Sequence, residues 1–139
     1  MKEESSKQFS FLYVEDNDSN RTVMRLLMEY AMSVQSLAIF EDSSNFMERV
    51  KALPQPPDVI LLDIHVRPLD GFEMLDLLRA DTVYHQSKII AVTASVTSEE
   101  IEEMSFAGFD GGIGKPLRVE TFPGLLTRIL NGETVWHVI

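Results

Sequence analysis

Side chains that could bind a metal ion or hold a phosphoryl group stand at the ends of four separate apolar runs of this sequence. They are two adjacent carboxylates, a third carboxylate, a hydroxyl and an amine: Glu15, Asp16, Asp63, Thr93 and Lys115. Carboxylates held close together repel and raise one another's pKa unless a cation lies among them. Mg²⁺ prefers oxygen ligands and commonly uses one or two carboxylates together with water. The set therefore predicts a magnesium site, provided that the fold brings these positions together.

Asp63 is the carboxylate of this set that we expect to react. Mg²⁺ and the ammonium of Lys115 would neutralise a phosphoryl group held on its oxygen, while the hydroxyl of Thr93 and the backbone N–H of Ala94 would donate hydrogen bonds. Taken singly, these residues have plainer explanations: Asp63 as a turn former or helix cap, Thr93 as a strand residue and Lys115 as a surface cation. Together they indicate a site because every one of them follows or ends a predicted strand.

Short apolar runs alternate with amphipathic segments along the whole sequence. Five runs have the length of strands, at 9–14, 34–40, 58–63, 88–93 and 111–114, and the last is a poor strand by propensity because it is rich in glycine. Helix signals follow the runs: Asn17 or Asp18 can cap the first helix, a third helix starts near Gly71, Thr97 to Glu100 has the form of a capping box, and Gly108 can end that helix.

This alternation implies a parallel sheet with helices on both faces and right-handed crossovers. All strands of such a sheet point the same way, so their carboxyl ends share one edge, where open α/β folds bind their ligands. Glu15, Asp63, Thr93 and Lys115 are therefore expected to meet at that edge. The first helix is expected to bury the apolar residues that recur at helical spacing, which are Val23, Leu26, Leu27, Tyr30 and Ala31.

Length, charge and composition limit the possible functions. The 139 residues fit one domain, which we assign to 9–130, with a flexible start at 1–8 and a tail at 131–139. A formal net charge of −10 opposes direct binding to nucleic acid, whose affinity depends on neutralising phosphates. Without cysteine, a signal peptide or an apolar run of roughly 20 residues, the chain is expected to be cytoplasmic, with no membrane partner.

With these motifs in place, the sequence resembles the receiver domain of bacterial two-component response regulators. The matching pieces span most of the chain and are Tyr13-Val14-Glu15-Asp16-Asn17, Leu61-Leu62-Asp63-Ile64, Leu69-Asp70-Gly71, Val92-Thr93-Ala94, Ala107-Gly108-Phe109-Asp110 and Lys115-Pro116. The resemblance implies a doubly wound, flavodoxin-like sheet of five parallel strands in the order 2-1-3-4-5. Because the length leaves little room for a second domain, we expect a stand-alone receiver, similar to CheY, that binds a protein target or passes its phosphoryl group on in a relay.

The resemblance also implies roles for individual residues. Asp63 would be the phosphoacceptor and would take the phosphoryl group from a phosphohistidine of a histidine kinase or a histidine phosphotransfer protein. Asp16 would bind Mg²⁺ directly, Glu15 directly or through water, and the backbone carbonyl of His65 would be a further ligand. Thr93 would turn toward the phosphoryl group, which would also meet the Ala94 N–H and pair with Lys115, and Pro116 would follow a cis peptide bond. Such a domain phosphorylates and dephosphorylates itself but is otherwise no enzyme.

Three positions depart from the pattern of the family. Receivers usually carry an aromatic residue two or three positions before the lysine, where this chain has Gly112, so the usual coupling between the threonine and that aromatic cannot operate in its standard form. The common Met-Pro after the phosphoacceptor is replaced by Val66-Arg67, with Pro68 one position late, which predicts another path for this loop. His65 lies two residues past Asp63, where its side chain is either inert or influences the access of water.

Three other functions compete with that of a phosphorylated receiver. A haloacid dehalogenase-like phosphatase needs Asp-x-Asp, and position 65 is His. A small flavin or nucleotide binder needs a phosphate-binding loop rich in Gly or Ser/Thr after the first strand, where Glu15-Asp16-Asn17-Asp18 is electrostatically opposite. A receiver-like module that binds a protein partner without being phosphorylated is the strongest alternative. Gly112 favours it, and the complete set of acids, Thr93 and Lys115 opposes it.

Overall fold

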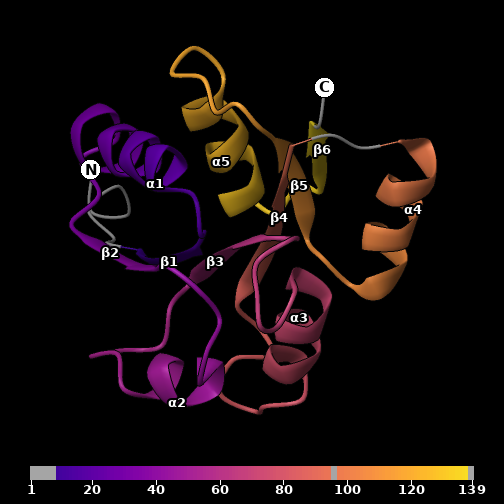
Figure 1. The fold of residues 1–139 in the computed structure, drawn as a ribbon. Helices are drawn as coiled ribbons and strands as arrows, with labels where there is room; N and C mark the ends of the chain where they lie inside the picture. Colours follow the sequence, from indigo (N-terminus) through magenta and orange to yellow (C-terminus); the bar gives the residue numbers. More distant parts are fainter. Residues whose placement is uncertain (1–8, 95–96, 138–139) are drawn as a thin grey trace.

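The apolar runs of the sequence form the strands of one parallel sheet (Figure 1). The computed structural model describes residues 9–94 and 97–137. The order of the strands is β2-β1-β3-β4-β5-β6, so the predicted order of the first five is confirmed. Their bounds are Ser10–Val14 for β1, Ser36–Phe40 for β2, Val59–Asp63 for β3, Lys88–Thr93 for β4, Gly111–Gly114 for β5 and Val135–His137 for β6. The flexible start predicted at 1–8 lies outside the described residues.

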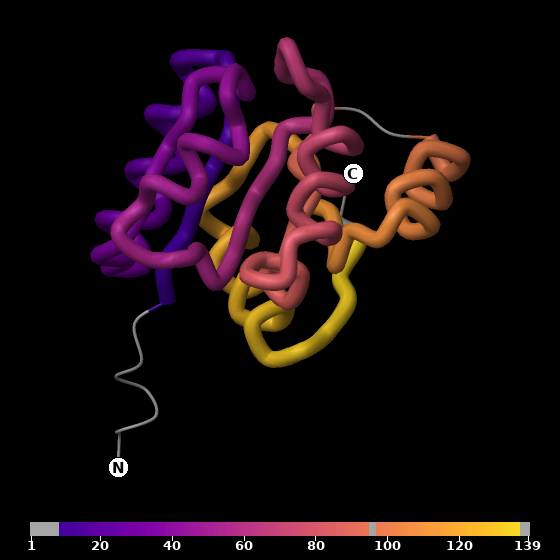
Figure 2. Tube along the Cα trace, turned by 90° about the horizontal axis from the view of Figure 1, so that it is seen from below, coloured from indigo at the N-terminus to yellow at the C-terminus, as the bar shows by residue number. Residues whose placement is uncertain are grey.

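Helices cover both faces of this sheet, as the alternating pattern predicted (Figure 1). They are α1 at Asp18–Arg25, the π-helix η2 at Leu26–Ala31, α2 at Phe46–Lys51, α3 at Gly71–Arg79, α4 at Ser98–Ala107 and α5 at Phe122–Leu130. One core packs α1, η2 and α5 against the sheet, and the other packs α2, α3 and α4 against it. In Figure 2, α1 in indigo and α4 in orange lie on opposite sides of the molecule. None of the described helices is long and apolar enough to cross a bilayer.

The predicted helix boundaries are set by the expected capping residues. Asn17 is the N-cap of α1, where its side chain accepts a hydrogen bond of 2.8 Å from the Asn20 N–H. The capping box that begins at Thr97 is present at the start of α4. Gly108 ends α4 with a φ of +113°, a left-handed conformation that glycine adopts without steric cost. These capping signals predict the helix ends correctly because each hydrogen bond or turn involves residues only a few positions apart.

Of the predicted buried face of the first helix, Leu27 is confirmed, but the face as a whole is displaced by one position. The residues that the structure buries on α1 and η2 are Met24, Leu27 and Met28. Of the predicted set, Leu26 is 51% exposed, Tyr30 is 77% exposed, and Val23 and Ala31 are exposed as well. The helix carries two adjacent apolar stripes, so spacing alone could not decide which one meets the sheet. After Arg25 the backbone also widens to a π-helix, in which the Met32 N–H donates to the Leu27 carbonyl at 3.1 Å.

The tail contributes a sixth strand that the sequence analysis missed. β6 pairs in parallel with β5, so that Gly111 lies opposite Val135 and Gly112 lies opposite Trp136. A Cβ atom on Gly111 would come within 2.7 Å of the backbone carbonyl oxygen of Val135. Gly111, one of the glycines that made β5 look like a poor strand, therefore allows the close approach of its neighbour.

We predict that Gly111→Ala lowers the free energy of unfolding by roughly 1–3 kcal/mol, because the new methyl group meets backbone that must move. Gly124→Ala is the matched control, since a Cβ there has no neighbour within 4 Å and the residue lies in α5. That control should leave stability unchanged or raise it by up to about 1 kcal/mol. Urea unfolding followed by far-UV circular dichroism measures both. Equal stability of the two variants would contradict the packing of β6 on β5.

Candidate functional site

The predicted chemical residues meet at one edge of the sheet, where four strands end. Glu15 directly follows β1, Asp63 is the last residue of β3, Thr93 is the last residue of β4, and Lys115 directly follows β5. Glu15, Asp63 and Thr93 are buried, with Asp63 only 5% exposed. Carboxylates are rarely buried to this extent unless they are paired. Their burial therefore separates this edge from an ordinary acidic surface.

Three carboxylates and one ammonium form the centre of the site. One carboxylate oxygen from each of Glu15, Asp16 and Asp63 lies within 4.8 Å of the other two. The Nζ atom of Lys115 lies 3.0 Å from Oε1 of Glu15 and 3.2 Å from Oδ2 of Asp63. The cluster keeps a formal charge of −2 that a divalent cation would balance. Because all donors are oxygen atoms, the set fits a hard cation such as Mg²⁺.

Burial and neighbouring charges shift the pKa values of this cluster in different directions. Burial raises the pKa of Asp63, and the Glu15 carboxylate raises it further, against the opposing hydrogen bond of 3.1 Å from the His65 backbone N–H. Burial would also raise the pKa of Glu15, but hydrogen bonds from Tyr13 and Lys115 hold it below the usual value. Burial would lower the pKa of Lys115, yet its two carboxylate partners raise it. Lys115 thus stays charged beside Asp63.

Tyr13 belongs to this site although the sequence analysis gave it no role. Its hydroxyl donates to Oε1 of Glu15 at 2.7 Å, and burial, together with this hydrogen bond, raises the pKa of Tyr13 far above the usual value. The other oxygen of Glu15 accepts from the Asn17 backbone N–H at 3.2 Å. Residues two apart on a strand share a face, so this spacing was the available signal for Tyr13. With both oxygens engaged, Glu15 is held in place, whereas Asp16 is exposed.

The loop after β3, whose sequence departs from the family pattern, is held in place by burial and by hydrogen bonds. Val66 is fully buried, and the peptide bond between Arg67 and Pro68 is cis. Ser43 holds the loop, since its hydroxyl lies 2.7 Å from both the carbonyl oxygen and the backbone nitrogen of Leu69. A Cβ on Gly71 would lie 2.9 Å from the Cα of Ile64, so a side chain at Gly71 would displace the chain next to Asp63.

The other predicted residues lie around this centre. Lys115 is fixed by its backbone N–H, which donates to the Thr93 carbonyl at 2.7 Å, and its peptide bond to Pro116 is cis, as the resemblance implied. The side chain of His65 is exposed, and it lines a cavity of about 120 Å³ together with Thr93. Ala94 follows Thr93 and is exposed.

Gly112 does not lie at this edge. It is buried within β5, where it pairs with Ala91 of β4 on one side and Trp136 of β6 on the other.

Comparison with known proteins links this arrangement to a family. Residues 11–127 match the family described as response regulator receiver domain. Among curated proteins, the chain is 29% identical over 133 residues to the signal transduction histidine-protein kinase BarA of Escherichia coli, covering 96% of this chain and 14% of that protein. It is 30% identical to a nitrate/nitrite response regulator homolog of Haemophilus influenzae, covering 89% and 58%. The chain thus spans less than two thirds of the length of these relatives.

Solved structures show the same fold. The receiver domain of sensor histidine kinase PA1611 from Pseudomonas aeruginosa has a TM-score of 0.77 and 25% identity, covers 91% of this chain and 100% of that one, and carries a magnesium ion in its active site cleft. The chemotaxis response regulator CheY4 of Vibrio cholerae has a TM-score of 0.77 and 22% identity, with 88% of this chain and 99% of that one covered. At this identity the second likeness is one of fold.

We predict that Lys115→Met raises the pKa of Asp63 further, because the carboxylate loses the cation 3.2 Å away that favours its charged form. A pH titration of the Asp63 carboxyl carbon by NMR, in the absence of divalent cations, measures the change. Lys51→Met is the control, since that lysine pairs with Asp81 at the surface and is 59% exposed. An unchanged Asp63 titration in Lys115→Met would show that the ion pair is not formed in solution.

Proposed function

This chain belongs to the response regulator receiver domain family, and on that basis we propose that it is phosphorylated on Asp63 by a phosphohistidine of a histidine kinase or a histidine phosphotransfer protein. The observation that carries the proposal is a buried carboxylate beside a fixed ammonium, at 3.2 Å, with two further carboxylates within reach of one cation. The two partner classes agree with a family whose members act with histidine kinases and phosphotransfer proteins. Signalling would then proceed through a protein target.

The proposed reaction is a direct transfer between two side chains. A carboxylate oxygen of Asp63 attacks the phosphorus, and a P–O bond forms as the P–N bond to the donor imidazole breaks. The imidazole nitrogen leaves with the electron pair of that bond. The ammonium of Lys115 stays beside Asp63 and balances charge on the transferred group, while the Thr93 hydroxyl and the Ala94 N–H supply hydrogen bonds. The product is an aspartyl phosphate.

The acidic cluster fits a divalent cation, and we propose that the cation is Mg²⁺. Asp16, Asp63 and the backbone carbonyl of His65 would hold it, with Glu15 as a ligand directly or through water. When bound, it supplies positive charge to the phosphoryl oxygens. Asp16 suits direct binding because its carboxylate is exposed. Glu15 suits an orienting role, because Tyr13 and Lys115 already bond one of its oxygens.

The exposed stripe of the first helix suits docking of the phosphodonor. It lines an apolar groove of about 460 Å³ with residues from the chain that follows Lys115, and the lining residues are Val23, Leu26, Leu27, Tyr30, Ala31, Leu117 and Val119. Because Leu117 lies two residues after Lys115, the groove adjoins the site. A helix of a phosphodonor packed in this groove would bring its phosphohistidine to Asp63.

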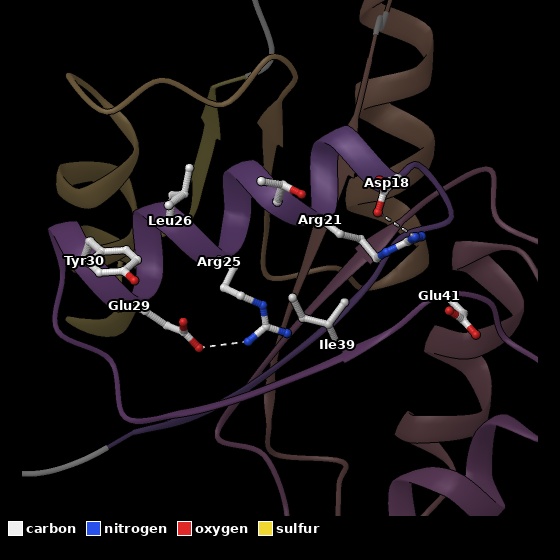
Figure 3. Close-up of a pocket in the computed structure, with 9 residues that line it drawn as sticks. Asp18, Arg21, Arg25, Leu26, Glu29, Tyr30, Ile39 and Glu41 are labelled. Carbon is white, nitrogen blue, oxygen red and sulfur yellow. Dashed lines mark hydrogen bonds and ion pairs between the residues drawn. The ribbon is translucent and has the colours of Figure 1, made fainter.

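A charged groove of about 400 Å³ lies on the same helix beside the apolar one. Figure 3 shows Arg25 and Glu29 joined by an ion pair next to Ile39, with Leu26 and Tyr30 further along the helix. The distance between Arg25 NH1 and Glu29 Oε2 is 2.9 Å. An apolar strip with charged groups beside it matches the composition of protein interfaces, which have an apolar centre and a polar rim.

Phosphorylation of Asp63 can be tested with a small phosphodonor. We expect the protein to gain one phosphoryl group from acetyl phosphate in the presence of Mg²⁺, and to gain none when Mg²⁺ is removed with a chelator. Intact mass measures the product. Asp63→Asn should abolish it, whereas Asp76→Asn, a change of an exposed acid on α3, should not. No adduct in the unmodified protein would favour a receiver-like module that binds its partner without phosphorylation, and an adduct in Asp63→Asn would mean another acceptor.

Docking at the groove can be tested separately from the chemistry. We expect Leu26→Asp to slow phosphotransfer from a phosphorylated histidine phosphotransfer protein by about tenfold or more, which corresponds to about 1.4 kcal/mol. The rate with acetyl phosphate should stay unchanged. Val83→Asp is the control, because Val83 is equally apolar and exposed but lies outside this groove. Equal slowing with both donors would indicate damage to the site and not to docking.

A further inference from the structure

The aromatic side chain that Gly112 lacks is supplied next to it by the tail. Gly112 pairs in register with Trp136 of β6. Trp136 is half-buried and packs against the core cluster that fills the space between the sheet and helices α2 to α4. The cluster includes Ala91, which is the other register partner of Gly112. An aromatic ring thus lies on the α4 side of the sheet beside a strand that carries no side chain at this point.

Gly111 of β5 permits β6 to lie this close. The Cβ that Gly111 lacks would lie 2.7 Å from the Val135 carbonyl oxygen, and this atom belongs to the backbone, which cannot turn aside as a side chain can. Val135 is itself buried in the second core, against α5 and the sheet. β6 is therefore a packed strand of the sheet with one residue in each core, Val135 in one and Trp136 in the other.

Helix α4 connects the site at Asp63 with Trp136. One side of α4 lines the cavity of about 120 Å³ that Thr93 and His65 also line, and its residues there are Glu100, Glu103 and Met104. An adjoining face of α4, which shares Glu103 with the first, lines a groove with Trp136. The lining residues from α4 are Glu99, Ile101, Glu102, Glu103, Ser105 and Phe106. Because Glu103 lines both, a displacement of α4 at the first cavity would also alter the groove at Trp136.

α4 is held to the sheet by little buried apolar surface. Of its ten residues only Met104 is buried, whereas α5, with nine, buries Phe122, Leu125, Leu126 and Ile129. A helix with few buried apolar side chains costs little free energy to shift. In Figure 1, α4 stands at the outer side of the sheet, next to β6 and away from α1.

We propose that Trp136 of β6 replaces the aromatic residue missing at Gly112, which makes the C-terminal strand part of the phosphorylation switch. This inference rests on the proposed function at Asp63. A phosphoryl group on Asp63 draws the Thr93 hydroxyl toward it, α4 follows into the space beside Thr93, and Trp136 packs more deeply between β5 and α4. The coupling is reciprocal, so the packing of Trp136 also changes the free energy of the phosphorylated state.

The sequence makes this directly measurable, because Trp136 is the only tryptophan. Beryllofluoride with Mg²⁺, a stable substitute for the phosphoryl group, should shift the Trp136 emission to shorter wavelength and reduce its quenching by acrylamide. Asp63→Asn should lose both effects. Occupancy of the site is established independently, by ¹⁹F NMR of the bound beryllofluoride and by intact mass after acetyl phosphate treatment.

Variants of Trp136 test its role beyond reporting. In Trp136→Ala the decrease in amide exchange of α4 on beryllofluoride binding should be lost, whereas Trp136→Phe, which keeps an aromatic ring, should retain it. Val83→Ala, a change of an exposed apolar residue elsewhere, should behave as the unmodified protein. Urea unfolding checks that each variant is folded. If Trp136→Ala does not fold, the change in Trp136 emission of the unmodified protein on beryllofluoride binding tests the proposal.

Two results would overturn the proposal while leaving phosphorylation of Asp63 intact. One is a saturated site with unchanged Trp136 emission and quenching. The other is a folded Trp136→Ala variant whose α4 responds as fully as in the unmodified protein. If the site takes up neither beryllofluoride nor a phosphoryl group, the proposed function itself fails, and the switch fails with it.

Discussion

The ion pairs between Lys115 and two buried carboxylates are the interaction on which the rest of this site depends. Burying an unpaired charge costs several kcal/mol or more. The ammonium that lies 3.0 Å from Glu15 and 3.2 Å from Asp63 offsets part of that cost for both carboxylates, together with their hydrogen bonds from Tyr13 and the backbone. With Lys115 counted, the three carboxylates of the cluster keep a formal charge of −2. The same arrangement thus leaves negative charge that suits a divalent cation, and it holds Asp63 beside a positive charge.

The parallel sheet makes this pairing possible. Glu15, Asp63 and Lys115 are far apart in the sequence, yet each stands at the carboxyl end of a strand, and neighbouring parallel strands end side by side. The loop next to the site is held by Ser43 and by the close approach of Gly71 to Ile64. The site is therefore built on the rigid part of the molecule, while exposed loops and the outer helix α4 surround it. Rigid placement suits a group transfer in which a misplacement of about 1 Å is costly.

β6 changes the meaning of the glycines in β5. In the sequence they weaken a strand and leave Gly112 where the family carries an aromatic residue, which favours a receiver-like module that is not phosphorylated. In the structure Gly111 permits the close approach of Val135. Gly112 lies opposite Trp136, whose aromatic ring packs against the core cluster. The absence of a side chain at Gly112 on β5 and the presence of Trp136 on β6 are therefore parts of the same packing arrangement.

The sequence by itself determined five of the six described strands, the helix caps and the convergence of Glu15, Asp63, Thr93 and Lys115, because each depends on local periodicity, on capping within a few residues or on the geometry common to all parallel sheets. The order of the strands followed from the resemblance to the receiver family. Only the tertiary structure decided which apolar stripe of the first helix faces the core, since Met24, Leu27 and Met28 compete with an equally apolar neighbouring stripe. It alone placed Trp136 beside Gly112. Pairing between β5 and β6 depends on backbone groups more than 20 residues apart in sequence, and a three-residue strand carries too little pattern to reveal its partner.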